Sequence, residues 1–366
     1  MFLYKHPDFD NHEQVTFFCD EKTGLRAIVA LHTTAPMGLA GGGCRFYPYR
    51  DDAEALRDVL RLSRAMSYKL ALCDMPAGGA KSVVIGDPAK DKTEPLLRAL
   101  GRCVEQLGGR YVIAEDVGTT PEDMRVIAKE TRYVVGRSTD TGPPTAYGVF
   151  VGLRTAVREA TGNSNLTGLT VAVQGLGNVG RRLCRHLVHA GADLIVTDVN
   201  QAAIEALFTD LKNSEGPQVE RRVKVVTPDA LYDQNAFVYA PCALGAVLND
   251  LTIPRLTCKV IAGAANNQLA EERHADELYR RGIVYAPDFI VNSGGVIGAS
   301  HELHEVVGTG GVPTPEQEAQ SFRDTEKIAG LLEQAFDLAR GQGISPHVAG
   351  VTMAKNKIRE RRSMTG

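Results

Sequence analysis

Residues 170–200 read TVAVQGLGNVGRRLCRHLVHAGADLIVTDVN, and their pattern predicts the fold of the second half of the chain. It opens with the apolar run TVAVQGL, passes through the glycine-rich turn 175-GLGNVG-180, continues at helical spacing and ends in a second apolar run, DLIVTDV. A strand, a GxGxxG turn, a helix and a second strand in this order are typical of a βαβ unit whose helix N-terminus holds the phosphates of a dinucleotide.

Three glycines and one carboxylate have distinct expected roles in this unit. We expect Gly175 to permit the tight turn, Gly177 to let a pyrophosphate approach the backbone, and Gly180 to let the helix pack on the sheet. Asp198 lies 18 residues after Gly180, at the end of the second strand. Its carboxylate would accept hydrogen bonds from the adenosine ribose and repel a 2′-phosphate, which favours NAD over NADP. The alternative is a tight strand–helix turn followed by a solvated aspartate.

The alternation of strands and helices continues beyond this unit. Short apolar runs at 223–226, 236–240, 259–263 and 282–287 predict further strands. We therefore predict an α/β protein whose second half is a doubly wound parallel sheet of the Rossmann type.

A full domain precedes the dinucleotide-binding unit. Apolar spacing predicts helices at 52–66 and 120–130, the second with a threonine cap and a proline in its first turn. Between them, PAGGA at 76–80 reads as a glycine hinge and SVVIGDP at 82–88 as a short strand ending in a turn. The segment near 137–147 reads as a linker, so we expect the active site in the cleft between two domains.

Composition narrows the class of protein. The 366 residues carry a formal net charge of −3, so no global basic field exists to hold nucleic acid. The sequence has no run of roughly 18 apolar residues and no signal peptide, so we expect no membrane span and a cytoplasmic location. The 7 cysteines form no CxxC pair, which favours reduced thiols over disulfides or a zinc site.

Two lysines and an aspartate border glycine-rich or strand-end segments. In 68-YKLALCDMPAGGAK-81, Lys81 follows glycines and apolar residues, where desolvation beside a second cation would favour loss of its proton. Lys69 would then be a fixed cation for a substrate carboxylate. Asp116, at the end of the strand-like run YVIAED, could carry protons between substrate and solvent. The alternative for each residue alone is an ordinary surface charge.

The sequence resembles the Glu/Leu/Phe/Val dehydrogenase family of amino-acid dehydrogenases, within it most of all the leucine, phenylalanine and tryptophan dehydrogenase branch. The resemblance covers nearly the whole chain. It rests on 42-GGCRFYPY-49, 66-MSYK-69, 76-PAGGAKSVVIGDP-88, 115-EDVGTTPEDM-124, 145-TAYGV-149, 173-VQGLGNVG-180, 240-APCALG-245, 262-AGAANNQL-269 and 285-YAPDFIVNSGG-295.

The resemblance implies a reaction and a division of roles. The reaction is the reversible oxidative deamination of an L-amino acid to its 2-oxo acid and ammonium, with NAD reduced. Lys69 and the Gly42–Gly43 backbone would hold the substrate carboxylate. Lys81 would activate the water that attacks the iminium, and Asp116 would move protons to and from the amino group.

The resemblance also implies how the two domains divide the work. Residues 1–138 with 318–366 would form a substrate-binding and oligomerisation domain, and 139–317 the NAD-binding domain. The expected assembly is a homo-oligomer, from dimer to octamer. Thr145 and Asn266 or Asn267 would orient the nicotinamide carboxamide and the substrate. The other expected cofactor contacts are Asn178, Val179, Ala240 and Cys242.

Three departures from the family pattern bear on the substrate and on activity. Gly41 stands where glutamate dehydrogenases have a lysine and branched-chain enzymes a leucine, so we predict an apolar substrate with a larger, aromatic side chain. Val296 and Ala299 are expected to line the same pocket. Ala80 replaces a glycine and could shift Lys81 or crowd the substrate carboxylate. Cys44 replaces a threonine and reads as a packed core cysteine.

Other functions stay open at this point. A branched-chain substrate (Leu, Val or Ile) follows if the loop at Gly41 collapses, and the departures also suit an unusual biosynthetic amino acid. A third alternative is a cofactor-binding homologue without turnover. The stretch 301-HELHE-305 is not HExxH, and we expect a solvated helix face and no metal site.

Overall fold

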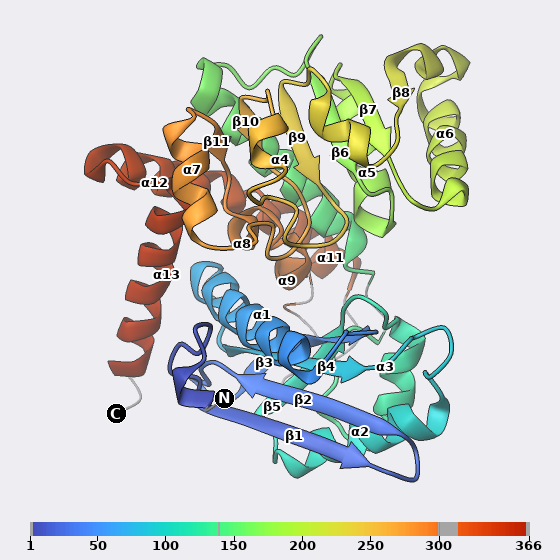
Figure 1. Cartoon of the computed structure of the whole chain (residues 1–366), viewed down its shortest axis with the longest axis vertical. Helices are drawn as coiled ribbons and strands as arrows, with labels where there is room; N and C mark the ends of the chain where they lie inside the picture. The colour runs from blue at the N-terminus through green and yellow to red at the C-terminus, as the bar shows by residue number, and fades with distance from the viewer. Residues whose placement is uncertain (1–2, 138–139, 299, 301–313, 364–366) are drawn as a thin grey trace. The chain divides into compact units, whose positions relative to one another are not determined.

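The computed structural model describes residues 3–137, 140–298, 300 and 314–363 (Figure 1). Contacts divide the chain into two compact units. Among the described residues, unit 1 contains 3–137, 140, 300, 314–318 and 354–363, and unit 2 contains 141–298 and 319–353. The sequence places 318–366 with the first domain, whereas these contacts place 319–353 in unit 2. The predicted domain boundaries stay a prediction.

Unit 1 is built on a five-stranded mixed sheet in the order β1-β2-β4-β3-β5. Its strands are β1 (Gln14–Asp20), β2 (Leu25–Leu31), β3 (Ala40–Tyr47), β4 (Gly78–Ile85) and β5 (Tyr111–Glu115). β3 runs parallel to both β4 and β5, while β2 runs antiparallel to β1 and β4. The carboxyl ends of β3 and β5 therefore lie at the same edge of the sheet.

Helices cover both faces of this sheet. α1 (Asp52–Leu72) packs on the face that carries Ile28, Ala30 and Val83. α2 (Glu94–Gln106) and α3 (Pro121–Ile127) cover the opposite face. The predicted start of the second helix is confirmed, because Thr120 and Asp123 form a capping box there.

The glycine hinge predicted at 76–80 is wrong. Gly78 and Gly79 belong to β4 and pair with Ala40 and Gly41 of β3. The N–H of Gly78 donates to the carbonyl of Leu39 at 3.0 Å, and the carbonyl of Gly79 accepts from the N–H of His32 at 2.9 Å. These pairings with neighbouring strands make the two glycines part of β4 instead of a turn.

Unit 2 is a six-stranded sheet in the order β11-β10-β9-β6-β7-β8, in which every pair is parallel (Figure 1). Its strands are β6 (Thr170–Gln174), β7 (Asp193–Thr197), β8 (Val223–Val225), β9 (Val238–Pro241), β10 (Val260–Ile261) and β11 (Val284–Tyr285). Two halves wind in opposite directions from β6 and β9, which confirms the predicted doubly wound sheet. Ligands of such sheets bind at this switch point, beyond the carboxyl ends of the strands.

The other α-helices of the described residues lie after residue 140. They are α4 (Gly142–Thr161), α5 (Asn178–His189), α6 (Gln201–Glu215), α7 (Arg273–Arg280), α8 (Asp288–Val291), α9 (Gly294–Gly298), α11 (Pro315–Thr325), α12 (Lys327–Gln342) and α13 (Pro346–Ser363). The segment predicted as a linker near 137–147 therefore includes the first turns of α4. In the described part of the chain, no helix is both long enough and apolar enough to cross a lipid bilayer.

Candidate active site

Both lysines singled out by the sequence lie in unit 1, on elements that pack together. Lys81 lies in β4 and Lys69 near the end of α1. A Cβ atom built on Gly79 would lie 2.0 Å from the backbone nitrogen of Ser67, so the bare strand lets α1 pack directly against it. Only 7% of Lys69 and 4% of Lys81 is exposed. Neither lysine is the ordinary surface charge that the sequence left open.

Lys81, Asp116 and Gly43 meet at one point. Nζ of Lys81 lies 2.8 Å from Oδ2 of Asp116. A Cβ atom on Gly43 would lie 2.9 Å from Cβ of Asp116 and 3.1 Å from Nζ of Lys81. The strand order therefore gathers an amine, a carboxylate and a side-chain-free backbone, although the three residues come from β4, the end of β5 and β3.

Asp116 is held in its ionised form. Burial alone would raise the pKa of its carboxyl, but the positive charges of Lys81 and then Arg45 outweigh burial and hold the pKa below its usual range. Nε of Arg45 donates to the same Oδ2 at 3.3 Å. A carboxylate in contact with a lysine can accept and pass on a proton.

Ala80 does not crowd Lys81. In β4 the two residues alternate, and the methyl group of Ala80 lies in the core cluster with Leu31, Cys44 and Val84. Lys81 faces the opposite side, where α1 packs. The methyl group therefore does not point towards Lys81, and its effect on activity stays a prediction.

Cys44 is the packed core cysteine that the sequence favours. It lies with Ala80 in the same core cluster and is fully buried. Burial raises the pKa of its thiol to about 12, so the group is neutral and inert at physiological pH.

Sequence reasoning missed three residues that are linked to Asp116 by a series of hydrogen bonds, in which Arg45 donates to Asp116 at 3.3 Å. Nη1 of Arg45 donates to Oδ2 of Asp58 at 2.9 Å, and the hydroxyl of Tyr49 donates to the same oxygen at 2.6 Å. The alternation of β3 could have indicated Arg45, because residues 43 and 45 share one face of a strand. Asp58 lies on α1 and Tyr49 beyond β3, so no local pattern indicates them.

The dinucleotide turn in unit 2 has the expected backbone form. Gly175 has φ +96°, and a Cβ atom on Gly180 would lie 2.0 Å from the carbonyl oxygen of Gly175. Gly177 caps the helix that begins with Asn178 and Val179, and a Cβ atom there would meet nothing within 4 Å. Tight packing at Gly175 and Gly180 with open space at Gly177 is the arrangement that a pyrophosphate needs.

Asp198 lies directly after β7, at the predicted strand end. Its Oδ2 accepts from the backbone N–H of Leu176 at 2.6 Å and its Oδ1 from that of Asn200 at 2.8 Å. The carboxylate is therefore fixed against the glycine turn. The hydroxyl of Thr197 beside it is buried and has no hydrogen-bond partner among the described residues.

The loop after β10 carries the two asparagines. Oδ1 of Asn266 accepts from Nδ2 of Asn292 at 2.9 Å. Asn267 has φ +51°, and its Nδ2 is buried without a hydrogen-bond partner in the described part of the chain. Because buried amide groups are normally paired, this donor is one that a bound ligand could satisfy.

The remaining predicted cofactor and pocket residues lie on neighbouring parts of unit 2. Ala240 is buried in β9, and the backbone N–H of Cys242 donates to the carbonyl of Gln174 at 2.7 Å. Thr145 lies on α4 and Val296 on α9. A Cβ atom built on Gly295, the neighbour of Val296, would lie 2.6 Å from Oγ1 of Thr145. Ala299 and the stretch 301–305 lie outside the described residues.

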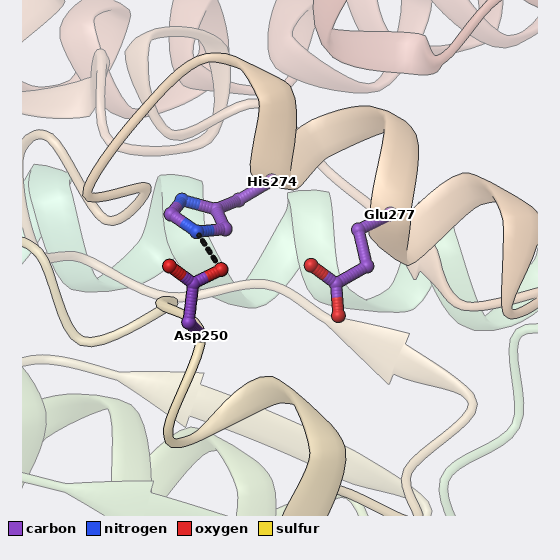
Figure 2. A group of neighbouring side chains, drawn as sticks. All are labelled: Asp250, His274 and Glu277. Atoms are coloured by element: carbon purple, nitrogen blue, oxygen red, sulfur yellow. Dashed lines mark hydrogen bonds and ion pairs between the residues drawn. The ribbon is translucent and has the colours of Figure 1, made fainter.

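One group of side chains that could together hold a metal occurs among the described residues, and it includes none of the predicted site residues. Figure 2 shows Asp250, His274 and Glu277, whose ligand atoms lie within 4.8 Å of one another. Nδ1 of His274 accepts from the backbone N–H of Glu271 at 3.0 Å, so its proton is on Nε2, which faces Oδ1 of Asp250 at 3.2 Å. A metal could bind this nitrogen only by displacing its proton.

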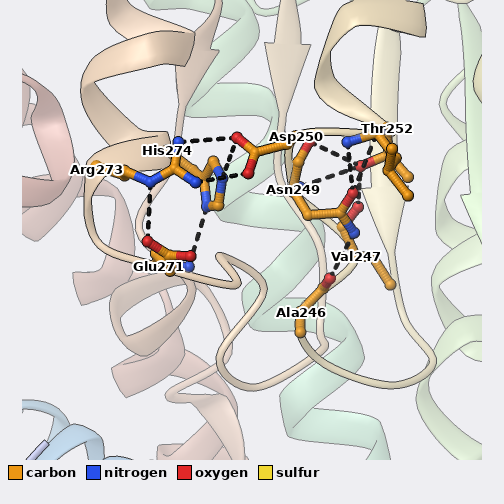
Figure 3. A network of polar contacts seen from close by, with 9 residues as sticks. Ala246, Val247, Asn249, Asp250, Thr252, Glu271, Arg273 and His274 are labelled. Carbon is orange, nitrogen blue, oxygen red and sulfur yellow. Dashed lines mark hydrogen bonds and ion pairs between the residues drawn. The ribbon is translucent and has the colours of Figure 1, made fainter. Parts of the chain in front are cut away.

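Arg273 makes a metal at this group still less favourable. It donates to both carboxylate oxygens of Asp250, at 2.8 and 2.6 Å, and to Glu271 at 2.8 Å. The hydrogen bonds from Arg273, and then the one from His274, lower the pKa of Asp250 to about 2. Figure 3 shows the network joining α7 to the loop 246–252. The hydrogen bonds from Arg273 and His274 to Asp250 therefore hold this loop against α7.

Comparisons with known proteins agree with this geometry. The Glu/Leu/Phe/Val dehydrogenase dimerisation-domain model matches residues 12–133, and the Glutamate/Leucine/Phenylalanine/Valine dehydrogenase model matches 136–366. Leucine dehydrogenase of Bacillus subtilis is 44% identical over 370 residues, covering 99% of this chain and 96% of that protein. Phenylalanine dehydrogenase of Bacillus thermotolerans is 42% identical, covering 96% and 89%. The crystal structure of L-tryptophan dehydrogenase from Nostoc punctiforme matches with a TM-score of 0.73 at 39% identity, covering 96% and 97%.

Proposed function

Because this chain belongs to the Glu/Leu/Phe/Val dehydrogenase family, we propose that it catalyses the NAD-dependent, reversible oxidative deamination of an apolar L-amino acid to its 2-oxo acid and ammonium. The family makes the chain an amino-acid dehydrogenase, an oxidoreductase. The single observation that carries the reaction is the buried Lys81–Asp116 pair beside the bare backbone of Gly43.

The residues of unit 1 divide the substrate chemistry between them. Lys69 and the Gly42–Gly43 backbone bind the substrate carboxylate; the carbonyl of Gly42 is held in place by the hydroxyl of Tyr111 at 2.9 Å. When bound, NAD supplies the acceptor for the hydride that leaves Cα. Asp116 takes the proton from the amino group, and Lys81 activates the water that attacks the iminium.

The residues of unit 2 fit NAD. The tight packing at Gly175 and Gly180 forms the turn, and Gly177 leaves room for a pyrophosphate at the start of α5. Asn267 offers a buried donor that has no hydrogen-bond partner among the described residues. Asp198, fixed by two backbone N–H groups, accepts from ribose hydroxyls and repels the 2′-phosphate of NADP.

The substrate side chain is proposed to be aromatic. Gly41 lies two residues before Gly43 in β3, so a side chain at 41 would lie on the face of β3 that carries the Lys81–Asp116 pair. Its absence leaves room for a larger substrate. The 44% identical leucine dehydrogenase favours a second candidate, a branched-chain amino acid.

A panel assay decides between these substrates. Purified protein is mixed with NAD and each L-amino acid near pH 10, and NADH absorbance is followed. Faster turnover of Phe, Tyr or Trp than of Leu and Val is expected, and Gly41→Leu should reverse that order. A wild-type preference for Leu or Val would contradict the aromatic proposal and leave the reaction intact.

Lys81→Ala tests the reaction itself. Loss of a catalytic acid–base group typically costs about 10²–10⁴ in rate, so kcat should fall by that factor while NAD binding, followed by fluorescence titration, stays unchanged. An unchanged kcat would contradict the assigned role of Lys81. A wild-type protein that binds NAD and turns over no amino acid would instead support the homologue without turnover.

The chain is proposed to act as a homo-oligomer. The dimerisation-domain model covers residues 12–133, and β1 forms an edge of the sheet with 62% of Phe17 exposed. An exposed apolar edge strand favours pairing with another copy. Light scattering should show more than one copy, and Phe17→Lys should lower the mass if β1 contributes. A cytoplasmic location stays a prediction.

A further inference from the structure

A chain of alternating charges leads from the surface of α1 to the proposed catalytic pair. The hydroxyl of Tyr49 donates to Oδ2 of Asp58 at 2.6 Å, and the same oxygen accepts from Nη1 of Arg45 at 2.9 Å. Nε of Arg45 then donates to Oδ2 of Asp116 at 3.3 Å, and that oxygen lies 2.8 Å from Nζ of Lys81. One guanidinium therefore joins two carboxylates through two different nitrogens.

We propose that Asp58 is a positioning residue for Asp116 and acts through the Arg45 guanidinium, with Tyr49 holding Asp58 in place. The proposal rests on the proposed dehydrogenase function. Asp58 does not touch the proposed reacting atoms; its carboxylate fixes the direction in which Arg45 donates and balances its charge.

The geometry explains why a second carboxylate is needed. Arg45 is largely buried, with 14% of its side chain exposed, and two bonds hold its planar group between Asp58 and Asp116. Without Asp58 the guanidinium is free to turn both nitrogens towards Asp116. Asp116 would then be drawn away from Lys81, and a displacement of about 1 Å at reacting groups can cost 100-fold in rate.

The charges around Asp116 determine in which direction the pH profile moves when Asp58 is neutralised. Its charged neighbours are Lys81 from β4 and Arg45 from β3, while the thiol of Cys44, with a pKa raised to about 12, is neutral. Thr119 accepts from the backbone N–H of Asp116 at 2.9 Å and carries no charge. Asp58, on α1, adds a negative charge on the other side of the Arg45 guanidinium. Neutralising it makes the surroundings of Asp116 more positive, so the pH profile is expected to move to lower pH.

The experiment compares pH profiles of kcat/KM on the full chain. Asp58→Asn keeps the shape and removes the charge, and Asp58→Glu restores the charge. Asp52→Asn is the matched control: it removes the same charge from the same helix, where Asp52 pairs with Arg26 at 2.5 Å and 71% of its side chain is exposed. Unfolding temperature is measured for every variant.

Asp58→Asn is expected to lower kcat about tenfold or more and to move the profile down by roughly half a pH unit. Asp58→Glu should restore the pH profile, Asp52→Asn should match the wild type, and Tyr49→Phe should lower kcat less without moving the profile. If the pH profile of kcat/KM for Asp58→Asn overlays that of the wild type, the proposal is wrong. This holds even if the variant has a lower unfolding temperature, because that result would show only a structural role. A wild type inactive on every amino acid would instead refute the proposed function.

Discussion

Adding one methyl group at Gly43 tests whether the Lys81–Asp116 pair is the working site. In Gly43→Ala, the new Cβ atom would lie 2.5 Å from the carbonyl oxygen of Glu115, 2.9 Å from Cβ of Asp116 and 3.1 Å from Nζ of Lys81. The first contact is with backbone of the paired strand β5, which no side-chain rotation can relieve.

The expected losses of stability and activity follow from these distances. Relief of the contact with Glu115 requires β3 and β5 to separate by roughly 0.5–1 Å, which carries Asp116 with it. Overpacking of this kind costs about 1–3 kcal/mol of folding free energy. Misplacement of the proton-transfer groups by about 1 Å should lower kcat/KM about 100-fold.

The assay is kcat/KM for the best amino acid in the panel, together with urea unfolding. Gly330→Ala is the control, because a Cβ atom at this position in α12 meets nothing within 4 Å and a helical alanine should stabilise the protein by about 0.5–1 kcal/mol. If Gly43→Ala is folded and keeps kcat/KM within about threefold of wild type, the pair beside Gly43 is not the catalytic site.

Three further changes have defined outcomes. Ala80→Gly should cost about 1–2 kcal/mol in urea unfolding, because a buried methyl is lost and the strand gains a glycine, without raising kcat; a rise in kcat would show that the methyl does crowd Lys81. Asp198→Ala should raise the NADP-to-NAD ratio of kcat/KM about tenfold or more, and an unchanged ratio would remove Asp198 from cofactor selection. The pKa of Asp250 is lowered from 3.8 to about 2, so its contribution to stability is full above about pH 4 and is lost as pH falls towards 2. Asp250→Asn should flatten the pH dependence of the unfolding free energy in that window, and an unchanged slope would show that its bonds to Arg273 do not stabilise the fold.

Several features were predictable because their causes are local. The turn from Gly175 to Gly180 needs glycine for its own backbone, and Thr120 caps its own helix, so a few consecutive residues carry the whole signal. The glycine hinge at 76–80 failed for the opposite reason. Local sequence favours a turn there, but pairing with β3 makes the segment a strand.

The amino-acid sequence alone was enough to predict that the second half is a doubly wound parallel sheet, and it singled out Lys69, Lys81 and Asp116 as charges beside glycine-rich or strand-end segments. Only the tertiary structure decided that Asp116 contacts Lys81 at 2.8 Å, that Ala80 faces the core, and that Asp58 reaches Asp116 through Arg45. Periodicity and turn chemistry act over a few residues and can be read along the chain. The contact between two strand ends depends on the order of strands in the sheet, and burial of the whole apolar surface decides that order.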